Sequence, residues 1–391
     1  MDKIKLGIIG IGNMGSGHAE NIKNNKCPEI ELIAIADNNS DRLEWAKEQN
    51  YANNVAYFSD AIEMLDSGLV DSCLIAVPHY DHTVYAIECM TRGIHVMVEK
   101  PAGVYTKQVK EMNKVADAHP DVVFGMMFNQ RTNCVYRKLK ELVESGEYGE
   151  IRRTNWLMTN WYRPQAYYNS GGWRATWSGE GGGVLLNQCP HQLDLWQWIC
   201  GMPKSVDAKM HFGKWHDIEV EDDVTAYVEY ENGATGVFIT STGDAHGTNR
   251  FEIQMDKAKF IVENDKLIVD EYDISEPEFS KTNEKPFGYI TSRKYEPETD
   301  GKNEQHIGVL NAWANAILHG GKLVADGKEG INGLALSNAM HLSAFLGKTI
   351  ELPLDDEVYY NELMKRVATS RKKDNVKTVF ADTSNTYGGI K

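Results

Sequence analysis

Val98-Glu99-Lys100-Pro101 places a carboxylate and an ammonium directly after the apolar run Ile94-His95-Val96-Met97, with Gly103 close behind. The apolar run predicts a buried parallel strand, and open α/β sheets bind ligands at the carboxyl ends of such strands. Pro101 lacks a backbone N–H and keeps Lys100 out of helical geometry, so the ammonium is able to stand in a cleft. Two interpretations follow from these residues alone: a Lys–Glu pair that closes the strand, or part of a catalytic site.

The N-terminal segment predicts a dinucleotide-binding unit. Ile4–Ile9 has the pattern of a buried strand, and a helix-compatible segment extends to about Asn24. The glycines between them match GxGxxG, which allows a tight turn, a close approach of backbone to pyrophosphate, and packing of helix on strand. The helix N-terminus then offers N–H groups to the phosphates. The predicted cofactor contacts here are Gly10, Gly12, Asn13, Met14 and Gly15.

Asp37 indicates which dinucleotide is bound. It ends a second strand, Glu31–Ala36, about 20 residues past the last glycine, where a carboxylate takes the adenosine ribose hydroxyls. A 2′-phosphate would meet its negative charge, so NAD is favoured over NADP. Asp37 is alternatively a cap for the helix that follows, and nearby Arg42 leaves room for dual cofactor use.

Strands and helices alternate through residue 128, which predicts a doubly wound parallel sheet. The later strands are expected at Val55–Phe58, Ser72–Val77, Ile94–Val98 and Val122–Phe128, with helices from Asp60, about Asp81 and Thr106. Further cofactor contacts are predicted at the carboxyl strand ends: Pro78, His79, His82, Glu99, Lys100 and Asn129. His82 is equally well explained as a structural residue at a helix start.

Composition limits the class of protein. A chain of 391 residues with 42% hydrophobic and 25% charged residues is an ordinary globular protein of two domains. Its net charge of −15 disfavours nucleic acid and anionic membranes, although an anionic ligand remains possible in a locally basic pocket. The six cysteines form no CxxC pair, so neither a metal site nor a disulfide framework is expected. The absence of a signal peptide or an apolar span favours the cytoplasm.

The pattern changes from Glu150, where long alternating runs predict an open, mostly antiparallel sheet. These runs are Ile151–Trp161, Ser205–Phe212, Val224–Tyr230, Ala234–Thr242, Asn249–Met255, Phe260–Val262 and Leu267–Val269. Glu276–Lys302, rich in proline and charge, predicts a long surface loop or insertion. Helices are expected at Tyr136–Ser145, Glu304–Leu318, Gly330–Leu346 and Asp355–Lys372, before a polar tail. The predicted division is 1–128 for the NAD-binding domain, 129–354 for the substrate domain, and 355–391 for a C-terminal helix and tail.

A second candidate site lies in Gly181-Gly182-Gly183-Val184-Leu185-Leu186-Asn187-Gln188-Cys189-Pro190-His191. Asn187 and His191 are four residues apart and would share one helix face. Pro190 fits only the first turn of a helix, which places Asn187 near the N-cap. In isolation, Asn187 as a cap and His191 as a core histidine explain the pattern well.

GIGNMG, the Val98–Pro101 motif and the triple glycine leading to His191 and Asp194 together resemble the glucose–fructose oxidoreductase/inositol dehydrogenase (Gfo/Idh/MocA) family over residues 1–353. The resemblance implies a Rossmann domain, a large open sheet that mediates homodimers or homotetramers, and NAD(P)-dependent oxidation of sugars and polyols. It makes Lys100 and His191 catalytic. Many members of the family carry Asp where this chain has Asn187. Asn at this position, together with the tryptophan-rich segment from Trp161 to Trp177, resembles the branch that oxidises the C3 hydroxyl of pyranosides and nucleotide sugars.

The implied mechanism has His191 accepting the hydroxyl proton while Lys100 stabilises the negative charge on the same oxygen. Asn187 would orient His191 or a sugar hydroxyl, and without a carboxylate the pKa of His191 should stay near 6.5. Stacking faces and donors for a sugar ring are expected from Tyr162, Arg163 and Tyr168. Trp173 and Arg174 are expected against the cofactor, and Arg131 and His306 near the substrate.

Two rival functions remain open. Some family members are glycosidases that use bound NAD for transient C3 oxidation, elimination and re-reduction. Others are NAD-binding regulators without catalysis, a reading that intact Lys100 and His191 disfavour.

Overall fold

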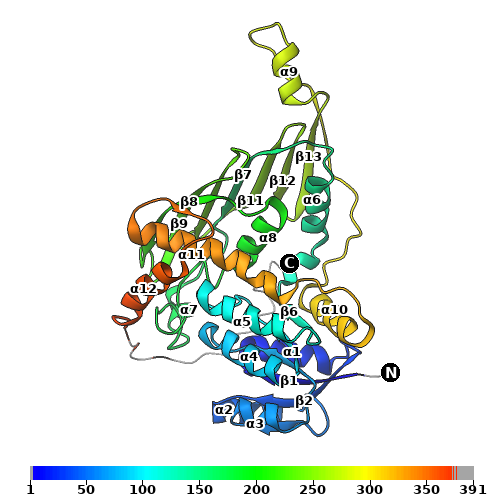
Figure 1. The fold of residues 1–391 in the computed structure, drawn as a ribbon, viewed down its shortest axis with the longest axis vertical. Coiled ribbons are helices and arrows are strands. Elements are labelled where there is room, and N and C mark those ends of the chain that lie inside the picture. Colours follow the sequence, from blue (N-terminus) through cyan, green and yellow to red (C-terminus); the bar gives the residue numbers. More distant parts are fainter. Residues whose placement is uncertain (1–2, 372, 374–375, 377–391) are drawn as a thin grey trace.

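The computed structural model describes residues 3–371, 373 and 376. Its first part is a six-stranded sheet in the order β3-β2-β1-β4-β5-β6, with all strands parallel (Figure 1). This is the doubly wound order of a Rossmann domain, and it confirms the predicted fold class. The elements are β1 (Ile4–Ile9), α1 (Asn13–Lys23), β2 (Ile30–Ala36), α2 (Ser40–Glu48), β3 (Ala56–Phe58), α3 (Ala61–Asp66), β4 (Ser72–Ile75), η1 (His79–Asp81), α4 (His82–Thr91), β5 (His95–Val98), α5 (Thr106–Ala118) and β6 (Phe124–Met126).

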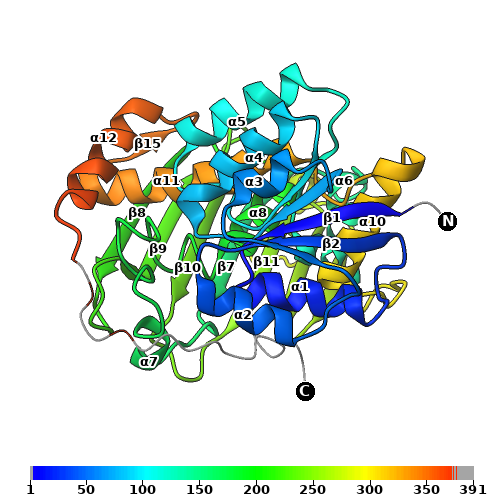
Figure 2. The same cartoon turned by 90° about the horizontal axis from the view of Figure 1, so that it is seen from below.

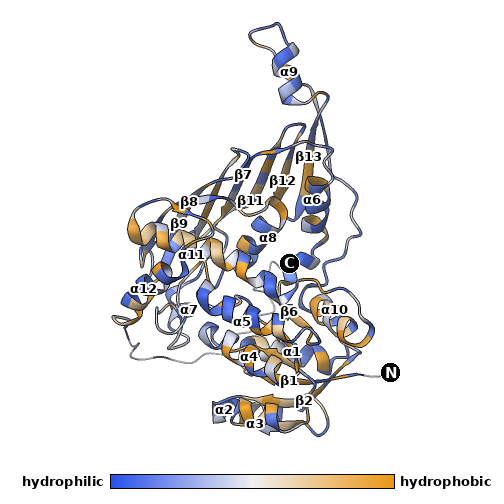
Figure 3. Cartoon of the chain, in the orientation of Figure 1, coloured by the Kyte–Doolittle hydropathy of each residue, from blue (hydrophilic) through white to orange (hydrophobic). Residues whose placement is uncertain are grey.

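The central strands form because they are apolar on both faces. Leu6 and Ile8 on β1 are fully buried, and Leu6 pairs with Leu32 of β2 on one side and Ser72 of β4 on the other. Figure 3 shows β1 and β2 as mainly hydrophobic. Helices cover both faces, so the carboxyl ends of the strands are the accessible edge of the sheet.

The second sheet has nine strands in the order β14-β13-β12-β11-β7-β10-β9-β8-β15. β7 and β10 run parallel and every other neighbouring pair is antiparallel, which confirms the predicted mostly antiparallel sheet. Helices α6, α8 and α11 cover one face (Figure 1). The elements are η2 (Asn129–Thr132), α6 (Cys134–Glu144), β7 (Ile151–Met158), α7 (Gln165–Tyr168), α8 (Pro190–Cys200), β8 (Ser205–Phe212), β9 (Glu221–Glu229), β10 (Thr235–Ser241), β11 (Asn249–Met255), β12 (Ala258–Glu263), β13 (Lys266–Tyr272), η3 (Gly327–Glu329), α11 (Gly330–Leu346), β15 (Ile350–Glu351) and α12 (Asp356–Val367).

The segment 276–302 differs from the predicted surface loop. It contains helix α9 (Glu276–Thr282) and strand β14 (Ser292–Tyr295), which pairs with β13 at the sheet edge. The α9 end projects beyond the sheet (Figure 1). Proline and charged residues correctly indicated an exposed segment, but they did not exclude a helix. Pro277 lies in the first turn of α9, where proline is compatible with a helix.

Helix α10 (Gln305–His319) crosses back from the second part of the chain to the first. Val309, Leu310 and Trp313 are buried in the same core cluster as Leu6 and Ile8 of β1. Figure 2 shows α10 lying beside β1. The predicted division at residue 128 assigns α10 to the second domain by sequence, but in space α10 packs on the nucleotide-binding sheet.

Three further observations concern the chain as a whole. None of the helices among the described residues is long and apolar enough to cross a membrane. All six cysteines are free thiols. The C-terminal helix ends at Val367, and Lys372 and the polar tail beyond residue 376 lie outside the described residues.

Candidate active site

The glycine loop has the shape that a dinucleotide needs. A Cβ on Gly10, whose φ is +90°, would lie 2.5 Å from the Ala76 carbonyl oxygen, and one on Gly15 would lie 2.0 Å from the Gly10 oxygen. A Cβ on Gly12, the N-cap of α1, would meet nothing within 4 Å. Gly10 and Gly15 thus close the turn against protein, while Gly12 leaves open the space that a pyrophosphate would take at the helix N-terminus. The residues present fit the cofactor.

Asp37 lies at the carboxyl end of β2 and is bound to this loop. Its Oδ2 accepts a hydrogen bond of 2.8 Å from Ile11 N, and its Oδ1 one of 2.9 Å from Asn39 N. The side chain that caps α2 is that of Asn39, so the alternative role of Asp37 as helix cap is wrong. Arg42 donates to the Ile11 carbonyl at 2.6 Å and 3.0 Å, and its guanidinium stacks 3.8 Å from the Trp45 ring.

Glu99 is buried behind the β5 terminus and is held as a carboxylate. His18 of α1 contacts its Oε1 through Nε2 at 2.7 Å, and Lys100 N donates to its Oε2 at 3.2 Å. Burial acts to raise the pKa of Glu99, but His18, together with the charges of His306 and Lys100, outweighs burial and lowers it to about 2. Glu99 is therefore a charged support for the strand end. Its exposed fraction is 4%, and its contact with the cofactor stays a prediction.

The Lys100 ammonium stands in the space between the two sheets. Its Nζ donates to the Asn187 carbonyl oxygen at 3.0 Å. Burial lowers the pKa of Lys100, and the carboxylates of Glu99 and Glu180 oppose that shift. The strand end after β5 and the triple-glycine segment are thus joined through Lys100, as the catalytic interpretation requires.

The triple-glycine segment is pinned by a buried carboxylate. Gly183 N donates to Glu221 Oε2 at 2.8 Å and Leu185 N donates to Oε1 at 3.0 Å. A Cβ on Gly183 would lie 2.1 Å from the Glu221 carbonyl oxygen, so only glycine fits there. The segment consequently has one fixed path beside Lys100.

Asn187 does not have the helix-capping role that its spacing predicted. Helix α8 has Cys189 as N-cap and Pro190 as its first residue, two positions later than expected. Asn187 lies in the preceding turn, where its Nδ2 donates to Glu180 Oε1. This carboxylate neighbour lies seven residues earlier in the same irregular segment, and the spacing of the residues did not predict the contact.

His191 lies in the first turn of α8 and is 3% exposed. Burial lowers its pKa well below the ordinary range, and the charges of Lys100 and His306 lower it further, against a smaller opposing effect of Glu99. The expected pKa near 6.5 is therefore corrected downward. His191 is a neutral imidazole at pH 7 beside an ammonium, which suits a proton acceptor.

Aromatic and basic residues of segment 161–174 surround Tyr167. The guanidinium carbons of Arg163 and Arg174 lie 5.1 Å and 4.7 Å from the centre of its ring, and Arg174 Nη1 donates to its hydroxyl at 2.9 Å. Trp173 packs edge-on against the His79 ring at 5.8 Å. Tyr162 is 45% exposed. Stacked guanidinium groups of this kind are suited to binding anionic or hydroxyl-bearing ligands.

Four predicted contact residues form hydrogen bonds or ion pairs with other parts of the protein. His82 is 1% exposed, with Nδ1 2.6 Å from the Pro101 oxygen and Nε2 2.8 Å from the Val77 oxygen. Arg131 forms a buried bidentate pair with Asp194 at 2.7 Å and 2.8 Å. Asn129 is fully buried and donates to Gln305 Oε1. The structure thus gives these three side chains protein partners, and their contact with a ligand stays a prediction.

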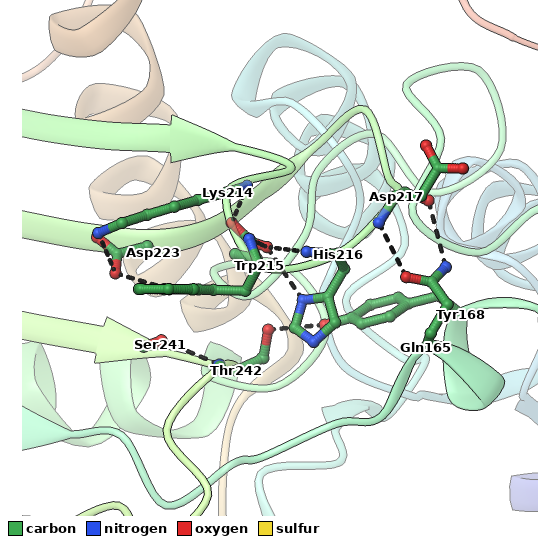
Figure 4. Close-up of polar contacts among 11 residues, drawn as sticks. Gln165, Tyr168, Lys214, Trp215, His216, Asp217, Asp223, Ser241 and Thr242 are labelled. Carbon is green, nitrogen blue, oxygen red and sulfur yellow. Dashed lines mark hydrogen bonds and ion pairs between the residues drawn. The ribbon is translucent and has the colours of Figure 1, made fainter.

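Tyr168 is the fourth. It is 3% exposed, and its hydroxyl donates to Thr242 Oγ1 at 2.7 Å. Figure 4 shows this bond and the His216 ring beside it, with ring centres 4.8 Å apart. Tyr168 thus anchors α7, which also carries Tyr167, and its contact with a substrate stays a prediction.

The remaining predicted residues have mixed surroundings. His79 is 5% exposed, with Nδ1 3.2 Å from the Glu180 carbonyl oxygen, and it follows Pro78 at the end of β4. His306 begins α10 with its ring 5.4 Å from that of His18, and burial lowers its pKa to about 4. His18, Tyr167, Glu180, Glu221 and Lys373 were not predicted. A carboxylate immediately before three glycines was the one visible signal, at Glu180.

Comparisons with known proteins agree with this architecture. The description "Oxidoreductase family, NAD-binding Rossmann fold" matches residues 4–126, and "GFO/IDH/MocA C-terminal domain" matches residues 136–261. Myo-inositol 2-dehydrogenase of Thermotoga maritima is 27% identical over 67% of this chain and 75% of that protein. D-glucoside 3-dehydrogenase of Escherichia coli is 29% identical over 59% of this chain and 68% of that protein.

Among solved structures, the WlbA dehydrogenase of Bordetella pertussis, in complex with NADH and UDP-GlcNAcA, is similar to this chain with a TM-score of 0.76. It is 28% identical, and the alignment covers 91% of this chain and 99% of that one.

Proposed function

Because this chain belongs to the Gfo/Idh/MocA family of oxidoreductases, we propose that it oxidises the C3 hydroxyl of a pyranose sugar or glycoside to a keto-sugar. It is an NAD-dependent dehydrogenase. The observation that carries the proposal is the buried His191, whose pKa is lowered by burial and by the charge of Lys100, together with the Lys100 ammonium that is held on the Asn187 carbonyl oxygen after β5. The similarity to D-glucoside 3-dehydrogenase supports the choice of C3.

The glycine loop and Asp37 would hold NAD, which supplies the acceptor for the hydride when bound. His191 takes the substrate hydroxyl proton at an imidazole nitrogen, because burial keeps that imidazole neutral. Lys100 Nζ, fixed at 3.0 Å from the Asn187 oxygen, donates a hydrogen bond to the same substrate oxygen as negative charge develops there. The substrate oxygen is thus contacted by a proton acceptor, His191, and by the positive charge of Lys100.

Segment 161–174 supports a sugar as the substrate. The rings of Trp161, Tyr162 and Tyr167 offer stacking faces, and Arg163 and Arg174 add donors beside them. A carboxylate or phosphate on the sugar would find two guanidinium groups here, in a chain whose overall charge is −15. An acidic sugar therefore belongs in any substrate screen.

The test is a screen of neutral glycosides, uronic acids and nucleotide sugars with NAD, followed by the absorbance of NADH. Reduction of the product with borodeuteride and mass spectrometry locates the oxidised carbon, and deuterium at C3 is expected. Deuterium at another carbon refutes the C3 assignment. Release of phenol from an aryl glycoside without net NADH identifies the glycosidase alternative, and NADH binding without turnover of any sugar favours the regulator.

A further inference from the structure

Glu180 is a buried carboxylate held at both ends. It is 2% exposed, its Oε2 accepts a hydrogen bond of 2.5 Å from Ala175 N, and its Oε1 accepts one from Asn187 Nδ2. Its own carbonyl oxygen lies 3.2 Å from His79 Nδ1. Burying a charged carboxylate costs free energy. Because Glu180 is buried and fixed beside the candidate active site, we expect it to have a role there.

Asn187 connects Glu180 to Lys100. Its side chain donates to Glu180, while its backbone oxygen accepts from Lys100 Nζ at 3.0 Å. A shift of Asn187 would therefore move the acceptor that holds the ammonium. The geometry gives Asn187 a connection to Lys100, whereas the sequence had assigned it to orient His191 or a sugar hydroxyl.

Charge links the same residues. The Glu180 carboxylate is one of two that favour the charged form of Lys100, and the other, Glu99, is engaged with His18. Lys100 is surrounded by groups of both signs from several elements: Glu99, Glu180, Arg163, Arg174, His79, His82, Cys189, His191 and His306. Glu180 in turn faces Arg174, Glu221, Tyr168 and Lys373. Among these neighbours, the guanidinium groups of Arg163 and Arg174 repel the ammonium, so loss of one carboxylate would leave its charged form with less support.

We propose that Glu180 and Asn187 form one positioning unit that keeps the Lys100 ammonium charged and directed at the substrate oxygen. The proposal rests on the proposed function, because it is in sugar oxidation that the ammonium has this task. Glu180 acts through Lys100 and touches no reacting atom. A purely structural Glu180 would anchor the loop 175–180 and have no effect on the titration of Lys100.

The test separates charge from anchoring with three variants. Glu180→Gln removes the charge at constant size, and Glu180→Asp keeps the charge but shortens the reach to Asn187. Glu221→Gln is the matched control, because Glu221 is buried and pins the same segment through Gly183 and Leu185. The measurement is the rate of Lys100 acetylation by acetic anhydride against pH, followed by mass spectrometry of the peptide, and it requires no substrate.

In Glu180→Gln the acetylation midpoint of Lys100 should fall by about 1 pH unit, since an opposite charge has been removed from its surroundings. Glu180→Asp should keep the midpoint near wild type but lower kcat, and Glu221→Gln should lower the melting temperature with the midpoint unchanged. An unchanged midpoint in folded Glu180→Gln, or an equal shift in Glu221→Gln, overturns the proposal. If Glu180→Gln does not fold, a wild-type kcat in Glu180→Asp overturns it instead.

The alkaline limb of kcat/KM for the sugar found in the screen should fall together with the midpoint. A shifted midpoint with no sugar turned over leaves the link between Glu180 and Lys100 in place and removes the sugar chemistry. Turnover of a sugar with an unshifted midpoint supports the sugar chemistry and overturns the link between Glu180 and Lys100. The two failures are thereby distinguishable.

Discussion

In the proposed mechanism, Lys100 stabilises the negative charge on the substrate oxygen. Lys100→Ala should lower kcat by about 10²-fold or more, because it removes the charge beside the developing alkoxide. The affinity for NADH, measured by fluorescence titration, should change little. Lys107→Ala is a suitable control, since Lys107 lies on α5 and its exposed side chain forms an ion pair with Glu357 of α12. Turnover near the wild-type level in Lys100→Ala would make the Val98–Pro101 motif structural.

Asn187→Asp tests whether the contact between residue 187 and Glu180 controls the charge near His191. The new carboxylate would lie beside buried Glu180, and two carboxylates at one site retain a proton between them. The net charge near His191 should then stay close to that of the wild type. The acidic limb of kcat/KM should consequently move by less than about 0.5 pH unit, far less than a lone carboxylate would cause. An upward move of about 1 unit or more would show that both carboxylates are ionised.

Single residues also show where prediction from sequence stops. Lys100 and His191 were identified because a motif and a resemblance pointed to them. Glu180 and His18 were not, because their contacts join residues that are distant in the chain or separated by an irregular turn. Residue spacing placed the N-cap of α8 at Asn187, two residues before the observed N-cap Cys189. The hydrogen-bond pattern decides such a boundary, and the sequence does not show it.

Among the elements, the glycine loop offers a matched pair of substitutions. Gly12→Ala should leave the melting temperature close to wild type, because its Cβ would meet nothing within 4 Å, but it should weaken NADH binding. Gly15→Ala should destabilise the fold by about 1–3 kcal/mol, because its Cβ would lie 2.0 Å from the Gly10 oxygen. Calorimetry and NADH titration on both variants provide the check. Equal effects on stability would contradict the assignment of Gly12 to the cofactor.

Asp37, which directly follows strand β2, is predicted to set the preference for NAD over NADP. Steady-state kinetics should show higher kcat/KM with NAD than with NADP. Asp37→Ala should narrow that ratio, since it removes a ribose partner and a repulsion of the 2′-phosphate together. Asp41→Ala, in the first turn of α2, serves as control. Equal efficiency of the wild-type enzyme with both dinucleotides would contradict the role of Asp37.

The elements were more predictable than their environment. Continuous apolar runs located the strands of the parallel sheet, and alternation located β7 to β13 of the second sheet, where one buried face leaves a regular pattern. The short strands β14 and β15 were not predicted. β8 and β11 have the predicted bounds. Helix α9 was missed, since a short exposed helix that buries no residue leaves no apolar pattern.

The molecule as a whole should lose stability in mild acid. Burial lowers the pKa values of His79, His191 and His306, so the folded state disfavours their protonation. For a base with a depressed folded pKa, the stabilisation is present above the unfolded pKa of about 6.5 and is lost as pH falls. The melting temperature should therefore be lower at pH 5.5 than at pH 7.5, with a smaller difference in His191→Gln. A constant melting temperature would contradict these shifts.

Helix α10 also determines how the protein is divisible in the laboratory. Trp313, which is fully buried, fills the Rossmann core from 185 residues beyond Phe128, so a fragment ending at residue 128 would expose the apolar surface that α10 covers. Such a fragment should aggregate or fold poorly when expressed alone. Complementation by a separate peptide of residues 305–319 should restore its solubility and its binding of NADH. The two parts of this enzyme are therefore interlocked, and a nucleotide-binding module for engineering must carry a helix from the far end of the chain.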